Sequence, residues 1–225
     1  MVRVSRSSCA HTVWRRAIGA AAVVIATQLA TRIARAEQTA TVAPPKGLVG
    51  GSGDGVYGRF DGDLDLGLAL GAELGSVGNA APTVRATAHY FSSAGLYASG
   101  RIKAGDHSAP SLFGIGVDLR PLFLPRWVKG LQTGSALFDL TLDSLSLSLG
   151  AFWPQQSDPQ GPKPYRGFDA QLGLGVPLLA TAPGPWIEVR GAFRYPDGAH
   201  REEAVLLLLS FHGLVTTPFS RGSGL

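Results

Sequence analysis

The most regular feature of the chain is an alternation of apolar residues with polar or small ones, which begins in DGDLDLGLALGAELG over residues 61–75. Successive side chains of an extended strand point to opposite faces, so the leucines of this stretch share one face and its acidic residues share the other. Seven further segments show the same period, and clusters of Gly, Pro, Ser and Asp separate them. The predicted strands are 62–74, 83–91, 95–104, 111–121, 135–151, 167–179, 186–195 and 204–215.

The fifth segment changes phase near Asp143 and Ser144. A shift of one residue sends every later side chain to the other face, so the pattern predicts a β-bulge at this point. The connection 122–134, just before this segment, is long where a short turn is expected. We expect it to fold as an interfacial turn or a short helix.

An even number of such strands predicts an all-β fold, an eight-stranded antiparallel up-and-down transmembrane β-barrel, because a tilted strand of about 9–11 residues crosses a membrane. Closure also pairs the backbone groups that an open sheet edge would leave bare in lipid. With both chain ends on the periplasmic side, the polar loops 152–166 and 196–203 face the outside and are the expected contact for an extracellular partner. Aromatic residues such as Trp127, Trp153 and Tyr195 gather near the strand ends, which is typical of a girdle at headgroup level.

The N-terminal residues differ from the rest of the chain. Arginines precede the apolar run 17–30, and Ala34-Arg35-Ala36 follows it, which together predict a secretory signal peptide cleaved after Ala36. The apolar run is shorter than the roughly 20 residues that a membrane-spanning helix needs. The expected organisation is a signal peptide over 1–36, a flexible Gly- and Pro-rich lead-in over 37–56, the barrel over 57–219 and a tail over 220–225.

Removal of the signal peptide changes the charge balance. Of the 20 Lys and Arg residues six lie in 1–36, so 14 remain against 16 Asp and Glu, and the formal charge becomes −2. No basic stripe is left to neutralise a run of phosphates, and we do not expect nucleic acid as a partner. The single cysteine, Cys9, also lies in the signal peptide, so neither disulfide nor thiol chemistry is expected.

Asp61, Asp63 and Asp65 stand at alternate positions and raise the question of a calcium site. An EF-hand-type loop needs Gly at its sixth position and Glu at its twelfth, where this chain has Leu66 and Ala72. On a strand, neighbouring members of the trio lie about 6.5–7 Å apart and cannot all bind one ion. We expect no metal, no cofactor and no enzymatic activity.

The charged residues on the polar strand faces are the main candidate site. Eight strands enclose only enough room for side chains, so these charges are expected to pair across the lumen and plug it. The predicted interior network comprises Asp63, Asp65, Glu73, Arg85, Arg101, Asp118, Arg120, Asp139, Asp169, Glu188, Arg190 and Arg194.

Signal peptide, lead-in and eight alternating segments together resemble the small bacterial outer-membrane β-barrels, the class of the OmpA membrane domain and OmpX. The resemblance covers about residues 57–219 and rests on this pattern. It implies a protein of the Gram-negative outer membrane with a structural or surface-interaction role. Membrane lipid and the export and barrel-assembly machinery are the partners that it implies.

Two other interpretations remain open. A soluble periplasmic or secreted barrel would turn the leucine face inward to bind a small apolar ligand, as lipocalins do, since alternation alone does not distinguish inside from outside. Glycines such as Gly67 and Gly71 on the opposite face count against it, because they are poor strand residues for a solvent-facing surface. A barrel enzyme acting on lipid or glycan would use His89, expected on an inward face, as a base beside a serine.

Overall fold

The computed structural model describes residues 57–75, 80–104, 110–155, 166–197 and 201–217. The chain divides into two compact units, Met1–Lys46 and Gly47–Leu225, and every described residue lies in the second. The predicted signal peptide, the lead-in and the tail therefore lie outside the described residues.

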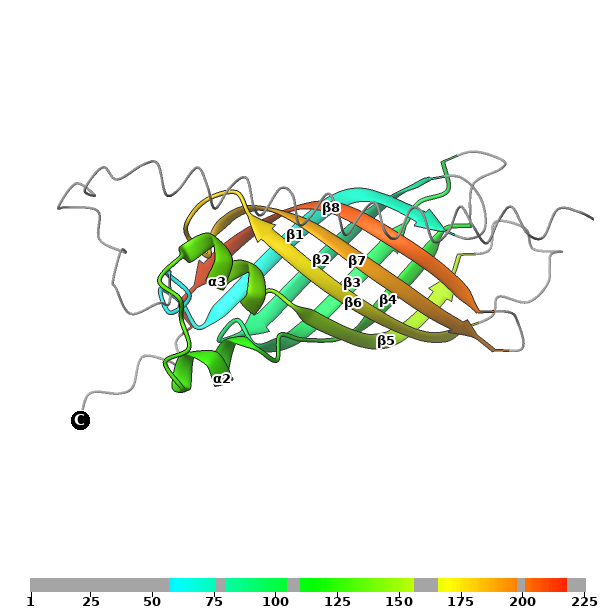
Figure 1. Ribbon diagram of the computed structural model, residues 1–225. Coiled ribbons are helices and arrows are strands. Elements are labelled where there is room, and N and C mark those ends of the chain that lie inside the picture. Colours follow the sequence, from blue (N-terminus) through cyan, green and yellow to red (C-terminus); the bar gives the residue numbers. More distant parts are fainter. Residues whose placement is uncertain (1–56, 76–79, 105–109, 156–165, 198–200, 218–225) are drawn as a thin grey trace, which may run out of the picture. The chain divides into compact units, whose positions relative to one another are not determined.

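Eight strands build this unit, and each pairs antiparallel with its neighbours along the chain (Figure 1). β1 also pairs with β8, with Leu68 opposite Phe211, so the sheet closes on itself and has no free edge. The predicted closed antiparallel barrel of eight strands is confirmed. The strands are β1 Leu64–Gly75, β2 Ala81–Tyr90, β3 Ala94–Arg101, β4 Leu112–Leu119, β5 Ser146–Pro154, β6 Gly167–Pro177, β7 Gly184–Pro196 and β8 Glu202–Val215.

The fifth predicted strand is wrong over its first half. Residues 136–143 form the helix α3 Ala136–Asp143, and β5 begins only after it. The helix buries one face with the spacing i, i+3, i+4 and i+7, which is the period of an amphipathic helix. Its buried residues are Ala136, Asp139, Leu140 and Asp143. The change of phase at Asp143 and Ser144 is thus a boundary between helix and strand, not a β-bulge.

The long connection after β4 contains a second helix, α2 Phe123–Val128, which is one of the two forms expected there. Gly130 ends it with a positive φ of 63°. The amide of Leu131 donates to the Arg126 carbonyl at 2.8 Å and the amide of Gly130 to the Trp127 carbonyl at 3.0 Å, which is the Schellman pattern. No helix in the described part of the chain is long and apolar enough to span a membrane.

The barrel has an apolar outer face and a charged inner face. Leu66, Leu68 and Leu70 of β1 are exposed on the outside, whereas Asp65 and Glu73 of the same strand are buried inside. The other strands alternate in the same way, with apolar side chains outside and charged side chains inside. In all eight strands the only charged residue on the outer face is Glu203, the second residue of β8.

Inward glycines leave room for the larger charged side chains. A Cβ atom on Gly173 would lie 2.9 Å from the guanidinium carbon of Arg190 and 2.7 Å from the hydroxyl of Ser146. A Cβ atom on Gly67 would lie 2.5 Å from the Thr87 hydroxyl and 3.1 Å from the ring of His212. Side chains at these two positions would collide with polar groups of the interior, which explains the glycines at positions 67 and 173.

Candidate functional site

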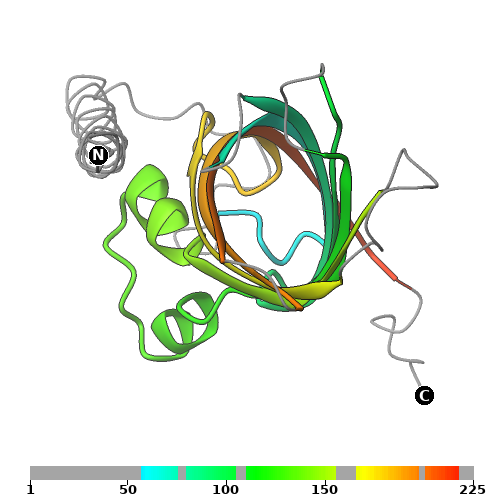
Figure 2. The ribbon, with the colours of Figure 1, turned by 90° about the vertical axis from the view of Figure 1, so that its right-hand side faces the viewer.

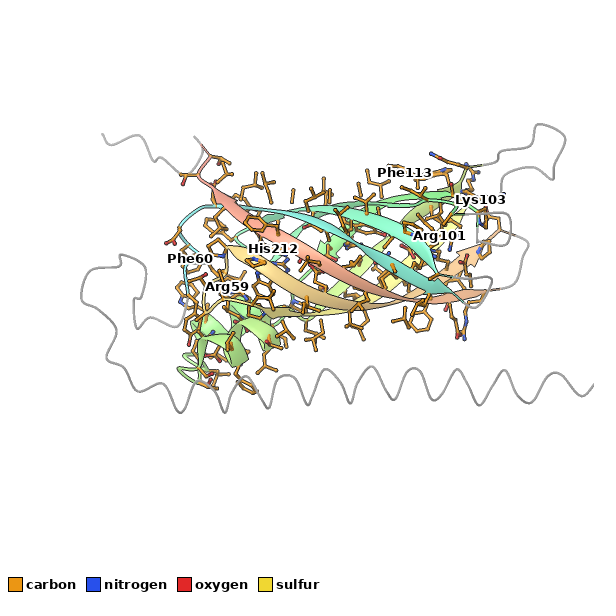
Figure 3. The ribbon with its side chains drawn as sticks, turned by 90° about the horizontal axis from the view of Figure 1, so that it is seen from above. Arg59, Phe60, Arg101, Lys103, Phe113 and His212 are labelled. Atoms are coloured by element: carbon orange, nitrogen blue, oxygen red, sulfur yellow. The ribbon has the colours of Figure 1, made fainter. Side chains whose placement is uncertain are left out.

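The buried charged residues of the barrel gather in three clusters along its length. We call the end that carries α2 and α3 the helix end and the opposite one the loop end. Figure 3 shows Arg59 and His212 toward the helix end and Arg101 toward the loop end.

The loop-end cluster joins β1, β3, β6, β7 and β8. Arg194 holds Glu73 with two hydrogen bonds, at 2.6 and 2.8 Å, and its Nε lies 3.5 Å from Asp169. Arg101 donates at 2.5 Å to both Glu73 and Glu202. Two arginines thus meet three carboxylates in a site closed to solvent, where each charge has an opposite partner.

The central cluster is organised around the carboxylate of Asp118, which is fully buried. Arg85 of β2 donates to Asp118 Oδ1 at 2.9 Å, and Arg190 of β7 does so at 3.3 Å. His89 Nε2 lies 2.7 Å from the other oxygen, and the hydroxyl of Ser148 also donates to Oδ1. One carboxylate of β4 therefore links β2, β5 and β7 across the lumen.

Arg85 also connects the central cluster to the loop end. Its guanidinium group lies 4.1 Å from the centre of the Tyr97 ring and donates to Gln171 at 2.9 Å. Both Tyr97 and Gln171 donate in turn to the carboxylate of Asp169, at 3.0 and 2.6 Å. The two clusters form one continuous polar network.

The helix-end cluster is centred on His212 of β8. Its Nδ1 lies 3.1 Å from Asp65, and its Nε2 lies 3.4 Å from Glu188. Arg120 donates to the second oxygen of Asp65 at 2.7 Å, and Arg190 donates to Glu188 at 3.1 Å, which joins this cluster to the centre.

Residues 57–60, just before β1, bridge the opening at the helix end. The carbonyl of Tyr57 accepts from the amide of Ala182 in the β6–β7 turn, and Phe60 contacts Phe91 in the β2–β3 turn. Between them Arg59 is buried, with its guanidinium carbon 4.5 Å from the centre of the Phe123 ring. Burial, the largest influence, lowers the pKa of Arg59 to about 10, so it stays charged at neutral pH.

A cavity of about 20 Å³ remains at the helix end, lined by Arg59, Asp65, Trp186 and His212 among others. This is room for about one water molecule, whereas pockets for drug-sized ligands measure roughly 300–1,000 Å³. Within the described ranges, no three His, Cys, Asp or Glu side chains are arranged to hold a metal ion.

His89 and His212 are both buried in the lumen, and a histidine base next to a serine can activate the serine hydroxyl as a nucleophile. His89, the candidate from the sequence, contacts Asp118 through Nε2, and its Nδ1 has no hydrogen-bond partner among the described residues. Ser210, His212 and Asp65 have the spacing of a catalytic triad, with the Ser210 hydroxyl 3.3 Å from His212 Nε2. All three are buried, and the adjoining cavity is too small for an acyl substrate.

Ten of the twelve residues of the predicted network line the lumen within these three clusters. The other two lie elsewhere. Asp139 is on α3, and its carboxylate accepts a hydrogen bond from Arg126 of the β4–β5 connection at 2.6 Å. The prediction that Asp139 lies on the inward face of a strand is therefore wrong. Asp63 precedes β1 and accepts hydrogen bonds from the amide of Thr217, at 2.5 Å, and from the hydroxyl of the same residue. The expected pairing of Asp63 with an opposite charge across the lumen is therefore wrong.

The sequence pattern missed several members of the site. Glu202 falls in the predicted loop 196–203, and Arg59 stands before the first alternating segment. Tyr97, Ser148 and Gln171 occupy inward positions of their strands, and that parity was a usable signal. A pattern based on charge alone does not include these uncharged residues.

Comparison with known proteins adds little. No family model matches the chain, and no curated protein matches it. Among solved structures, this chain is similar to Ail, the attachment invasion locus protein of Yersinia pestis, crystallised in complex with the heparin analogue sucrose octasulfate. The two sequences are 10% identical. The match covers 66% of this chain and 95% of Ail at a TM-score of 0.33, and a likeness this weak carries no argument.

Proposed function

We propose that this chain is an outer-membrane β-barrel with a structural or surface-interaction role, and that its own side chains close its lumen. The proposal includes export through a signal peptide over 1–36 and a barrel domain over 57–219. Membrane lipid and the assembly machinery are its expected partners.

The observation that carries the proposal is the distribution of charge between the two faces. Glu203 is the one charged strand residue on the outside, while leucines such as Leu68, Leu70 and Leu209 stand exposed there. Soluble monomers rarely expose contiguous apolar patches larger than a few hundred Å², because burying such a surface is favourable. An uncharged apolar wall around a closed barrel suits contact with lipid, where every backbone group must be paired within the protein.

Three features support a closed lumen. The ion pairs of the three clusters occupy the interior, residues 57–60 bridge its helix end, and the cavity beside them holds about one water molecule. In planar bilayers we expect the purified protein to give no steady conductance above background. Discrete channels of uniform size would refute the closed lumen without refuting the membrane location.

The membrane location has its own tests. The protein should be recovered with the outer-membrane fraction, migrate on gels in a heat-modifiable manner and begin at Glu37 when its N-terminus is sequenced. Release as a soluble monomer by osmotic shock would contradict the proposal. The sequence assigns 152–154 and 202–203 to loops, but these residues belong to β5 and β8. If the β5–β6 and β7–β8 connections face the outside, where an extracellular partner would meet them, a tag inserted within 156–165 should be accessible on intact cells and a tag in the β6–β7 turn should not.

The soluble ligand-binding alternative requires the leucine face to enclose a cavity. The leucines of β1 lie on the outer face, and the cavity at the helix end measures only about 20 Å³, so no observation favours this function. An enzyme using His89 lacks a serine in contact with that ring among the described hydrogen bonds. Neither alternative is proposed.

A further inference from the structure

We propose that the connection between β4 and β5, residues 120–145, is a membrane-surface anchor whose exposed apolar side chains enter the lipid leaflet at the helix end. The inference rests on the proposed function, since it requires the barrel to lie in a membrane. It adds a second lipid contact to the one made by the barrel wall.

The surface of this connection is apolar and lacks exposed acids. Its exposed large side chains are Leu124, Trp127, Val128, Leu131 and Phe138. Val128 is 74% exposed and Leu131 56% exposed. Both acidic residues of 121–145, Asp139 and Asp143, are buried against Arg126, and the exposed charge is Lys129. Apolar side chains, a tryptophan and a lysine without carboxylates are typical of an element that lies in the membrane interface.

The connection is placed beside the barrel wall. In the view along the barrel, α2 and α3 lie outside the ring of strands and not across its opening (Figure 2). Figure 1 places both helices at one end of the barrel. An element that projects sideways from this rim lies over the leaflet that surrounds the barrel.

A row of aromatic rings joins the barrel wall to the connection. Tyr90 is the last residue of β2 and is exposed on the outer face. The centre of its ring lies 4.5 Å from the centre of the Phe91 ring. The centre of the Phe60 ring lies 6.1 Å from that of Phe91 and 4.8 Å from that of Trp127. Aromatic contacts therefore lead from the outer face of β2 to α2, and this continuity with the apolar wall favours lipid over a protein partner as the occupant of the exposed surface.

Internal hydrogen bonds hold the connection in one conformation. The Asp139 carboxylate accepts from the Tyr57 hydroxyl at 2.8 Å, from Arg126 at 2.6 Å and from the backbone amides of Thr133 and Gly134. Burial alone would raise the pKa of Asp139, but these hydrogen bonds outweigh it and hold the pKa below its ordinary value. The connection thus presents its apolar side chains from a fixed scaffold.

Single-cysteine spin labelling tests the anchor, because the only native cysteine, Cys9, lies in the predicted signal peptide. Val128→Cys and Leu131→Cys would each carry a nitroxide in vesicles of phosphatidylethanolamine and phosphatidylglycerol. Leu68→Cys on the barrel wall is the lipid control, and Asp61→Cys at the same end is the water control. Heat-modifiable migration would verify that each variant is folded.

We expect labels at residues 128 and 131 to be more accessible to oxygen and less accessible to a water-soluble nickel complex than the label at residue 61. Accessibility at 128 and 131 equal to that at 61, with residue 68 in lipid, would overturn the anchor and leave the barrel proposal standing. An aqueous label at residue 68 would instead refute the proposed function. Labels at 128 and 131 shielded from both reagents would indicate burial against protein, either this chain or a second copy, and would also overturn the anchor.

Discussion

Asp118→Asn is the sharpest test of the charged interior. Asp118 is fully buried and takes hydrogen bonds from Arg85, Arg190, His89 and Ser148. Asparagine preserves the shape but removes the charge, and it leaves two buried guanidinium groups without their shared carboxylate. Breaking a buried ion pair from one side costs about 3–5 kcal/mol. We expect about 3 kcal/mol here, the lower end of that range, because the amide oxygen still accepts a hydrogen bond.

The effect is measurable by urea unfolding of the refolded protein, followed by its heat-modifiable gel shift. With a slope of about 2 kcal/mol per molar urea, a loss of about 3 kcal/mol lowers the midpoint by about 1.5 M. The matched control is Asp197→Asn, because this carboxylate is 74% exposed and 3.9 Å from Arg166. A surface pair of this kind contributes at most about 1 kcal/mol. Equal midpoints for the two variants would show that the interior network does not hold the barrel together.

Three further predictions concern other parts of the molecule. Leu68→Arg, at an outward position 57% exposed, should reduce the free energy of folding into vesicles by about 2–4 kcal/mol, and Leu68→Ala should cost clearly less if that position faces lipid. Gly173→Val should lower the unfolding midpoint because its Cβ would lie 2.9 Å from Arg190, whereas Gly191→Ala, with no atom within 4 Å of the new Cβ, should leave it unchanged. The pKa of Asp139 is lowered in the folded state, so its stabilisation of the connection is present above the unfolded pKa of about 3.9 and is lost as the pH falls through the folded pKa. The protection factors of the Thr133 and Gly134 amides in hydrogen exchange, taken relative to the unfolded chain at the same pH, should therefore fall in acid, and pH-independent protection factors would contradict this.

Alternation predicted seven strands well because each of them keeps one face in a single environment along its whole length. It failed over 136–143, where Phe138, Leu140 and Leu142 fit a period of two although the segment is helical. Contacts distant in sequence select the helix: Leu140 packs with Ala182 and Trp186, and Asp139 binds Tyr57, which is 82 residues away. No local pattern contains those partners.

The sequence by itself determined which residues share a face, because neighbouring side chains of a strand must point to opposite sides. It also determined the division between leucines and charged residues that makes the barrel amphipathic. Only the closed tertiary structure decided that the leucines face outward, since a strand pattern is the same in both orientations. Closure likewise chose the partners of each charge, bringing Glu73 to Arg194 across 121 residues and Asp118 to Arg190 across 72. Pairing depends on which strands lie opposite each other in the barrel, and no single strand carries that information.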